Sequence, residues 1–112
     1  MRWPHSEIVD GLPVEYSYGG TVSKDLFTDL PESEQQKALE WIAAYMRPIK
    51  SENRRHSSYG LKHSLQYDTG VYMCNNQFKH LMLICGYEPV DEHELNWTFR
   101  ISERQLKKRS RP

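Results

Sequence analysis

One helical pattern constrains the fold of this chain more than any other feature. Within residues 75–85 the apolar side chains follow the spacing i, i+3, i+4, i+7, at Phe78, Leu81, Met82 and Cys85. Asn75 or Asn76 is suited to cap the start of this helix, and Gly86 is suited to end it. Because a helix with one apolar face must cover that face, we expect it to pack against further helices in a small core.

Two further helices are predicted upstream. Residues 31–46 carry a broad apolar arc, and Pro31, Glu32 and Glu34 suit the first turn of a helix there. Ser57 or Ser58 would cap a second helix that ends at Gly70. Gly60 lies inside that helix and costs about 1 kcal/mol relative to alanine, which suggests a close approach at that position.

The remaining segments predict β structure at both ends of the helical region. Residues 12–18 alternate in polarity as a short strand does, and Gly19-Gly20 predicts a turn after them. Residues 87–90 and 96–102 are expected to pair as a hairpin around an acidic loop. The predicted class is therefore α+β, with about three helices, a short N-terminal strand and a C-terminal hairpin, which is the order of a winged-helix-like domain.

The chain length and the charge distribution limit how the protein can be organised into domains and surfaces. With 112 residues the chain is predicted to be one globular domain over residues 1–106, followed by a basic, disordered tail at 107–112. Its net charge of zero hides an asymmetry, because residues 1–46 carry a net −5 and residues 47–112 a net +5. We therefore expect an acidic half and a basic half that attract partners of opposite sign.

The expected location is the cytoplasm. Residues 1–11 lack the apolar segment of a signal peptide, and no run approaches the roughly 18 apolar residues that a membrane helix needs. Two cysteines, Cys74 and Cys85, do not make a disulfide framework.

The sequence offers little sign of catalysis or of a bound group. The familiar catalytic and nucleotide-binding motifs are absent, and the five histidines lack metal-ligand spacing. We therefore expect a protein that is not an enzyme and that uses no metal and no cofactor. A monomer and a homodimer both remain open, because Leu83, Ile84 and Trp97 are candidates for a dimer face.

A DNA-binding interpretation follows from the predicted helix pair. Polar side chains near the start of the helix at 75–85 are of the types that contact base edges, and basic side chains elsewhere suit phosphates. The candidates for base edges are Asn76, Gln77, Lys79 and His80. The candidates for phosphates are Arg54, Arg55, Lys62, Arg100, Lys107, Lys108 and Arg109. The long connection between the helices and the acidic loop in the predicted wing weaken this interpretation.

A different interpretation rests on acidic and aromatic residues. Three Trp and seven Tyr are more than a small core requires, and both types anchor protein interfaces. An acidic face bearing such anchors resembles what a nucleic-acid mimic presents to a basic groove. The candidate residues are Asp25, Asp29, Glu32, Glu34, Asp91, Glu92, Glu94, Tyr16, Tyr18 and Trp41.

A family resemblance covers residues 58–102, which are 45 of the 112 residues. The pattern SYxLKH, TGxY, NxxFKxxM, GYxP and NWxFRIS resembles small accessory proteins carried by phages and integrating elements. That group has no settled activity, so the resemblance assigns no catalytic residues. It implies a mobile-element protein, and small charge-polarised proteins of that origin frequently inhibit host defence, as anti-CRISPR proteins do, or act as regulators.

These observations lead to two expectations. The first is a binding protein that inhibits a host defence complex, a protein or ribonucleoprotein, through its acidic face. The second is a winged-helix-like regulator that binds double-stranded DNA.

Overall fold

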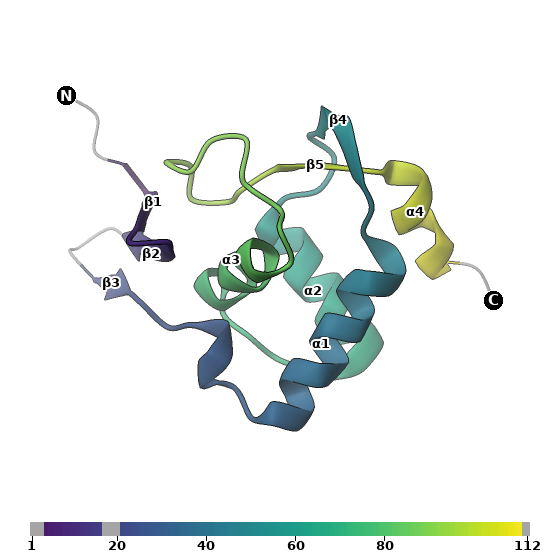
Figure 1. Cartoon of the computed structure of the whole chain (residues 1–112), viewed down its shortest axis with the longest axis horizontal. Helices are drawn as coiled ribbons and strands as arrows, with labels where there is room; N and C mark the ends of the chain where they lie inside the picture. The colour runs from purple at the N-terminus through teal and green to yellow at the C-terminus, as the bar shows by residue number, and fades with distance from the viewer. Residues whose placement is uncertain (1–3, 17–20, 111–112) are drawn as a thin grey trace.

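A cluster of three helices forms the centre of the molecule, with a small sheet toward each end (Figure 1). The computed structural model describes residues 4–16 and 21–110. The helices are α1 (Glu32–Tyr45), α2 (Ser58–Thr69) and α3 (Asn75–Ile84), with a short C-terminal α4 (Glu103–Lys107). The strands are β1 (Ser6–Val9), β2 (Leu12–Tyr16), β3 (Val22–Ser23), β4 (Pro48–Asn53) and β5 (Phe99–Ile101), and two 3₁₀ turns are η1 (Phe27–Asp29) and η2 (Lys108–Ser110). The predicted α+β class is confirmed.

The three central helices begin and end close to where local chemistry predicts. α2 follows Ser57, and Gly70 ends it with φ 78°, a left-handed conformation that favours glycine. α3 is preceded by Cys74 rather than by an asparagine, and the Gln77 side chain accepts a hydrogen bond from the Cys74 backbone N–H at 2.9 Å. A β-carbon added at Gly60 would have no atom within 4 Å, so the predicted close approach there is wrong.

The two sheets differ from the prediction. β1, β2 and β3 form an antiparallel three-stranded sheet, so the single predicted N-terminal strand is one of three. The prediction of a C-terminal hairpin is wrong, because β5 pairs with β4 and residues 87–90 form no strand. One backbone bond, from Val90 N–H to the Thr98 carbonyl, is all that links the two predicted hairpin arms in the described part of the chain. Without that hairpin there is no wing, so the winged-helix-like arrangement is also wrong.

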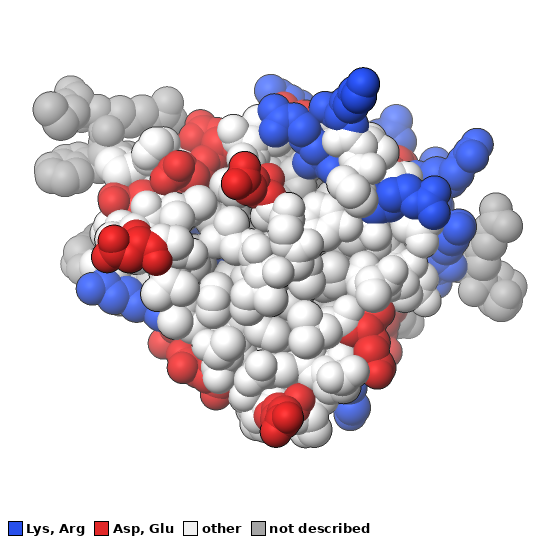
Figure 2. Space-filling view, viewed as in Figure 1, with Lys and Arg blue, Asp and Glu red and all other residues white. Residues whose placement is uncertain are grey.

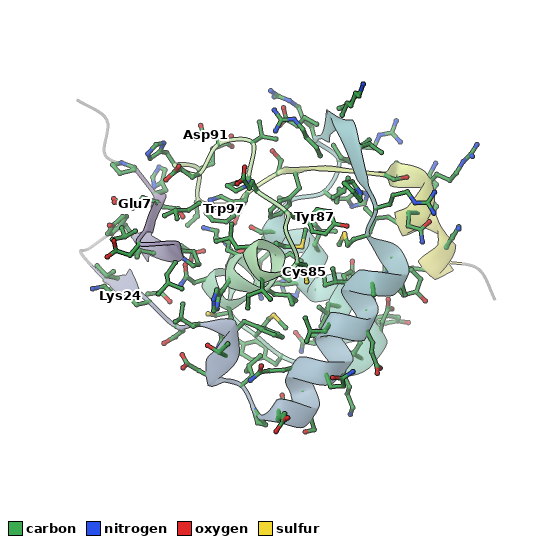
Figure 3. The ribbon with its side chains drawn as sticks, viewed as in Figure 1. Glu7, Lys24, Cys85, Tyr87, Asp91 and Trp97 are labelled. Atoms are coloured by element: carbon green, nitrogen blue, oxygen red, sulfur yellow. The ribbon has the colours of Figure 1, made fainter. Side chains whose placement is uncertain are left out.

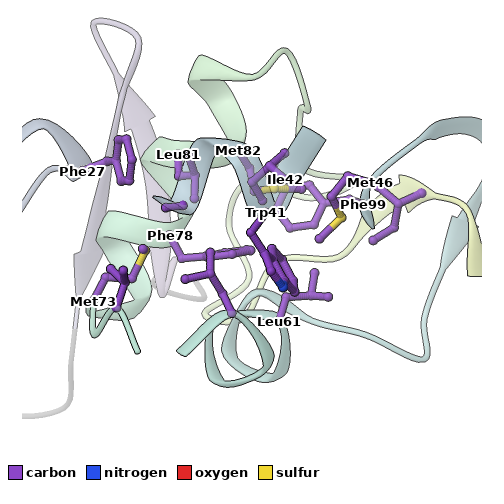
Figure 4. Close-up of a cluster of buried hydrophobic side chains, with 14 of the residues drawn as sticks. Phe27, Trp41, Ile42, Met46, Leu61, Met73, Phe78, Leu81, Met82 and Phe99 are labelled. Atoms are coloured by element: carbon purple, nitrogen blue, oxygen red, sulfur yellow. The ribbon is translucent and has the colours of Figure 1, made fainter. Parts of the chain in front are cut away.

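The core lies where the three helices meet β5 (Figure 4). α3 contributes Phe78, Leu81 and Met82, the stripe that the sequence predicts, and all three are fully buried. Trp97 is fully buried too, so it is excluded from the dimer face proposed for it. The other large core members come from η1, α1, α2, β5 and the segments that follow α1 and α2, at Phe27, Trp41, Ile42, Met46, Leu61, Leu65, Met73, Phe99 and Ile101.

The C-terminal segment is folded as far as it is described. Residues 103–110 form α4 and η2, and the Ser102 hydroxyl caps α4 by accepting a hydrogen bond from the Gln105 backbone N–H at 3.1 Å. The predicted disorder from residue 107 is therefore wrong for residues 107–110. Within the described ranges no helix is long and apolar enough to cross a membrane.

Candidate functional site

The side chains expected to contact base edges lie inside the protein. Asn76 and Lys79 are fully buried, and His80 is 7% exposed. Gln77 is half-buried and donates to the Leu26 carbonyl at 3.2 Å. α3 is covered on its polar side by η1 and the sheet β1–β3, so it presents no reading face to DNA. The base-contact role predicted for these four residues is wrong.

Lys79 instead joins the N-terminal sheet to the core. Its ammonium lies 2.8 Å from a Glu15 carboxylate oxygen and 3.0 Å from the Ser6 hydroxyl. The Trp97 ring, labelled in Figure 3, lies 5.0 Å from the same nitrogen. Burial lowers the pKa of Lys79, while Glu15 opposes this shift by stabilising the charge. Lys79 is therefore a structural cation, which explains its place on a helix surrounded by protein.

Asn76 and His80 hold the chain that leads into α1. The Asn76 amide donates to the carbonyls of Pro13 and Asp25 at 2.9 and 2.8 Å. His80 Nδ1 accepts a hydrogen bond from the Phe27 backbone N–H at 3.0 Å. Burial lowers the pKa of His80, which favours the neutral imidazole that can accept this bond.

Basic residues gather on a surface formed by β4, β5, α4 and their neighbouring turns. Figure 2 shows Lys and Arg side chains clustered where Figure 1 places β4, β5 and α4. We call this surface the basic face; its exposed members are Lys50, Arg54, Arg55, Arg100, Arg104, Lys107 and Lys108. Five of them were predicted as phosphate contacts, at Arg54, Arg55, Arg100, Lys107 and Lys108, and all five are exposed as that role requires.

The other two predicted phosphate contacts are engaged inside the fold. Lys62 is 7% exposed, and its ammonium lies over the rings of Tyr59 and Tyr72. Arg109 makes two hydrogen bonds to Asp68, at 2.6 and 3.0 Å, and these hold the pKa of that carboxyl below its usual value. Burial therefore excludes Lys62 from phosphate contact, whereas Arg109, whose side chain is 21% exposed, is paired with Asp68.

A carboxylate fixes the turn that carries two members of the basic face. Glu103 accepts hydrogen bonds from the Asn53 side chain at 3.0 Å and pairs with His56 at 2.8 Å. The Asn53 bond is the main cause that lowers the Glu103 pKa, and His56 adds to it. Asn53 also accepts from the Arg55 backbone N–H at 3.0 Å, so the residues on either side of Arg54 are held in place. An open cleft of about 380 Å³ lies against this turn.

Most cations of the basic face have no carboxylate partner. Arg54 pairs with Glu52 at 3.3 Å, and the Glu52 carboxylate also accepts from the Thr98 hydroxyl. Over residues 4–16 and 21–110, the side chains of Lys50, Arg55, Arg100, Arg104, Lys107 and Lys108 form no ion pair. Their charges are therefore available to an anionic partner.

The residues of the predicted acidic face lie in two separate parts of the molecule. Asp25, Asp29, Glu32 and Glu34 lie around η1 and the start of α1, whereas Asp91, Glu92 and Glu94 lie in the loop before β5. Acidic side chains are spread around the visible surface rather than gathered (Figure 2). Several also serve the fold: Asp29 accepts from the Leu26 N–H, and Glu92 accepts from the Ile8 N–H at 3.0 Å.

The structure describes two of the aromatic anchors predicted for that face, Trp41 and Tyr16, and both are engaged within the fold. Trp41 is 4% exposed, and its indole N–H donates to Asp68 at 2.7 Å, so the predicted exposed anchor is wrong. Tyr16 is half-buried, and a hydrogen bond to Glu7 raises its pKa. Tyr18 lies outside the described residues.

A second cleft, of about 460 Å³, lies between β1 and the segment after α3. Its apolar lining comes from Ile8, Leu83 and Val90, and Glu88 and Glu92 add negative charge. Within the described residues no group of three or more His, Cys, Asp or Glu side chains is placed to hold a metal ion.

The chain matches no protein-family model, and neither a curated protein nor a solved structure is similar to it. The arguments for a function therefore rest on the surfaces described above. Sequence reasoning missed the burial of the polar side of α3 at Asn76, Lys79 and His80, because polar side chains along one side of a helix usually mark its solvent-exposed face.

Proposed function

We propose that this protein is a non-enzymatic, cytoplasmic nucleic-acid-binding protein that contacts phosphates through its basic face. The observation that carries the proposal is the set of six exposed Lys and Arg side chains without an ion pair, on β4, the turn after it, β5, α4 and η2. Cations clustered in this way release counterions from a nucleic acid when they bind it, which is the main source of sequence-independent affinity.

The surface is also pre-organised for such a partner. β4 and β5 form a ribbon, and Arg100 points away from the core because its neighbours Phe99 and Ile101 are fully buried. The Glu103 bonds to Asn53 and His56 fix the adjacent turn, so less conformational entropy is lost on binding. This role suits an accessory protein of a mobile element and replaces the predicted use of α3.

The test is a titration of labelled DNA with the wild type and with the variant Lys50→Glu/Arg100→Glu. We expect wild-type binding that weakens with salt, and a flatter dependence in the variant, by about 0.7–0.9 in log–log slope per lost phosphate contact. Lys24→Glu/Lys37→Glu, at two exposed positions outside the basic face, changes the net charge by the same amount; it is the matched control and keeps wild-type binding. Equal losses in both variants would show that net charge matters rather than the basic face.

A second candidate function is inhibition of a host defence complex through protein contact. The cleft beside β1 favours it, because its apolar lining and acidic residues suit a peptide segment with apolar and basic side chains. Leu83→Asp/Val90→Asp would abolish capture of such a partner without affecting nucleic-acid binding. Loss of both activities would point to a folding defect, which circular dichroism detects.

A further inference from the structure

A row of ring side chains runs along the outer face of α2. Tyr59, His63 and Tyr67 occupy positions i, i+4 and i+8, which lie on one side of a helix. Tyr59 is 53% exposed and Tyr67 is 88% exposed, and His63 is exposed as well. The rings of Tyr59 and His63 meet edge to face at 4.6 Å. We call these three side chains the ring row; the core does not use it.

A buried lysine holds one end of the ring row. The Lys62 ammonium lies 5.2 Å from the centre of the Tyr59 ring and 5.5 Å from that of the Tyr72 ring. Tyr72 is itself 62% exposed, so both rings are steadied by a cation and still face solvent. Rings that are fixed before binding lose little side-chain entropy when they contact a partner.

Positive charge borders the ring row at both ends. Arg54 and Arg55 lie in the turn that precedes the first residue of α2. At the other end, Arg109 binds Asp68 and donates to the Ser64 carbonyl at 3.4 Å, which holds η2 and its Lys108 against the side of α2. The ring row therefore lies between two groups of the cations that make up the basic face.

We infer that the ring row is a stacking platform for the bases of a single-stranded nucleic acid, an inference that rests on the proposed function. Every base has a π face, so aromatic side chains beside a basic path bind single strands with little regard to sequence. The backbone positions of the ring row follow one another about every 6 Å along the helix axis, close to twice the roughly 3.4 Å between stacked bases, so a stretched strand advances by about one nucleotide per position. The Tyr59 and His63 rings are closer than this, with centres 4.6 Å apart.

The ring row should contact the bases of single strands but not those of duplexes. In a duplex the base faces are stacked on one another, and aromatic side chains on a convex helix cannot reach them. Phosphate contacts alone would bind both forms, whereas the ring row adds affinity only for exposed bases. We therefore expect the protein to prefer a single strand over a duplex of the same length.

The experiment compares three probes by fluorescence anisotropy: an oligothymidylate, the same sugar–phosphate chain without bases, and a duplex of equal length. Wild-type protein is expected to bind the oligothymidylate most tightly. Tyr67→Ala should weaken that binding about tenfold while leaving the abasic probe unchanged. Tyr67→Phe keeps the ring and should bind as wild type, and Ile84→Ala, an exposed apolar truncation on α3, is the matched control.

The possible results distinguish a failure of the ring row from a failure of the proposed nucleic-acid binding. If wild type binds no probe even at low salt, the proposed function fails. If it binds all probes equally, or if Tyr67→Ala binds the oligothymidylate as wild type does, the basic face stands and the ring row is overturned. Because Tyr67 is 88% exposed, its replacement leaves the core intact, and a thermal unfolding curve confirms this for each variant.

Discussion

At the residue scale, His80 makes the stability of the protein depend on pH. Its Nδ1 accepts the Phe27 N–H only when the ring is neutral, and burial lowers its pKa below the usual 6.5, against a smaller opposing effect of Asp29. As pH falls below 6.5 the unfolded chain takes up this proton before the folded protein does. The free energy of unfolding therefore decreases from about 6.5 down to the folded pKa and is unaffected by this group above 6.5.

Urea unfolding at pH values on either side of 6.5 measures this contribution. His80→Gln keeps an acceptor for Phe27 and should show a smaller loss of stability on acidification than wild type. His63→Gln, at an exposed position on α2, is the control and should retain the wild-type loss. A wild-type pH dependence in His80→Gln would assign the effect to other groups.

At the element scale, one glycine inside α2 and one directly after it should respond to replacement in opposite ways. Gly60 lies inside the helix with open space around its missing β-carbon, so Gly60→Ala should stabilise the protein by about 0.5–1 kcal/mol. Gly70 has φ 78°, where a side chain is strained, so Gly70→Ala should destabilise it by about 1–2 kcal/mol. Urea midpoints of the two variants test this directly, and shifts of the same sign would contradict the α2 boundaries.

At the scale of the whole molecule, polar contacts fasten the sheet β1–β3 to the helices. Of its apolar residues Val14 is buried and Ile8 packs partly against the main core, whereas Val9, Leu12 and Val22 are exposed. The Lys79 contacts to Ser6 and Glu15 and the Asn76 bond to Pro13 carry the attachment. We expect β1–β2 amides to exchange hydrogen faster than those of α3, because little buried apolar surface opposes local opening.

Lys79→Met should increase the difference in amide exchange rate between β1–β2 and α3. Removing the cation leaves Glu15 without its partner, so stability should fall by about 3 kcal/mol and exchange in β1–β2 should accelerate most. Adding Glu15→Gln to that variant should recover part of the loss, because no uncompensated charge remains. Lys24→Met, near the same sheet but exposed, should match wild type in both measurements. Uniform acceleration throughout the chain would contradict a separately attached sheet.

The helices were predictable because their signals are local. The stripe at Phe78, Leu81 and Met82 and the stop at Gly70 each depend on neighbours within a few residues. The sheet partners were not predictable, because β4 and β5 are about fifty residues apart, and the alternation of buried and exposed side chains in β5 does not identify the strand it pairs with. The same contrast holds for the binding surfaces. The sequence shows where the Lys and Arg residues are, but it does not distinguish the exposed ones from Lys62, Lys79 and Arg109, whose side chains are engaged within the fold.

The sequence by itself determined the α+β class, the three central helices and the basic character of the C-terminal half, since periodicity, capping and charge are properties of short segments. Only the tertiary structure decided which side chains face solvent. The sheet β1–β3 covers the polar side of α3 and buries Lys79, whereas the pairing of β4 with β5 brings distant arginines and lysines onto one surface. Burial and charge clustering arise from contacts between segments far apart in the chain, which no local pattern records.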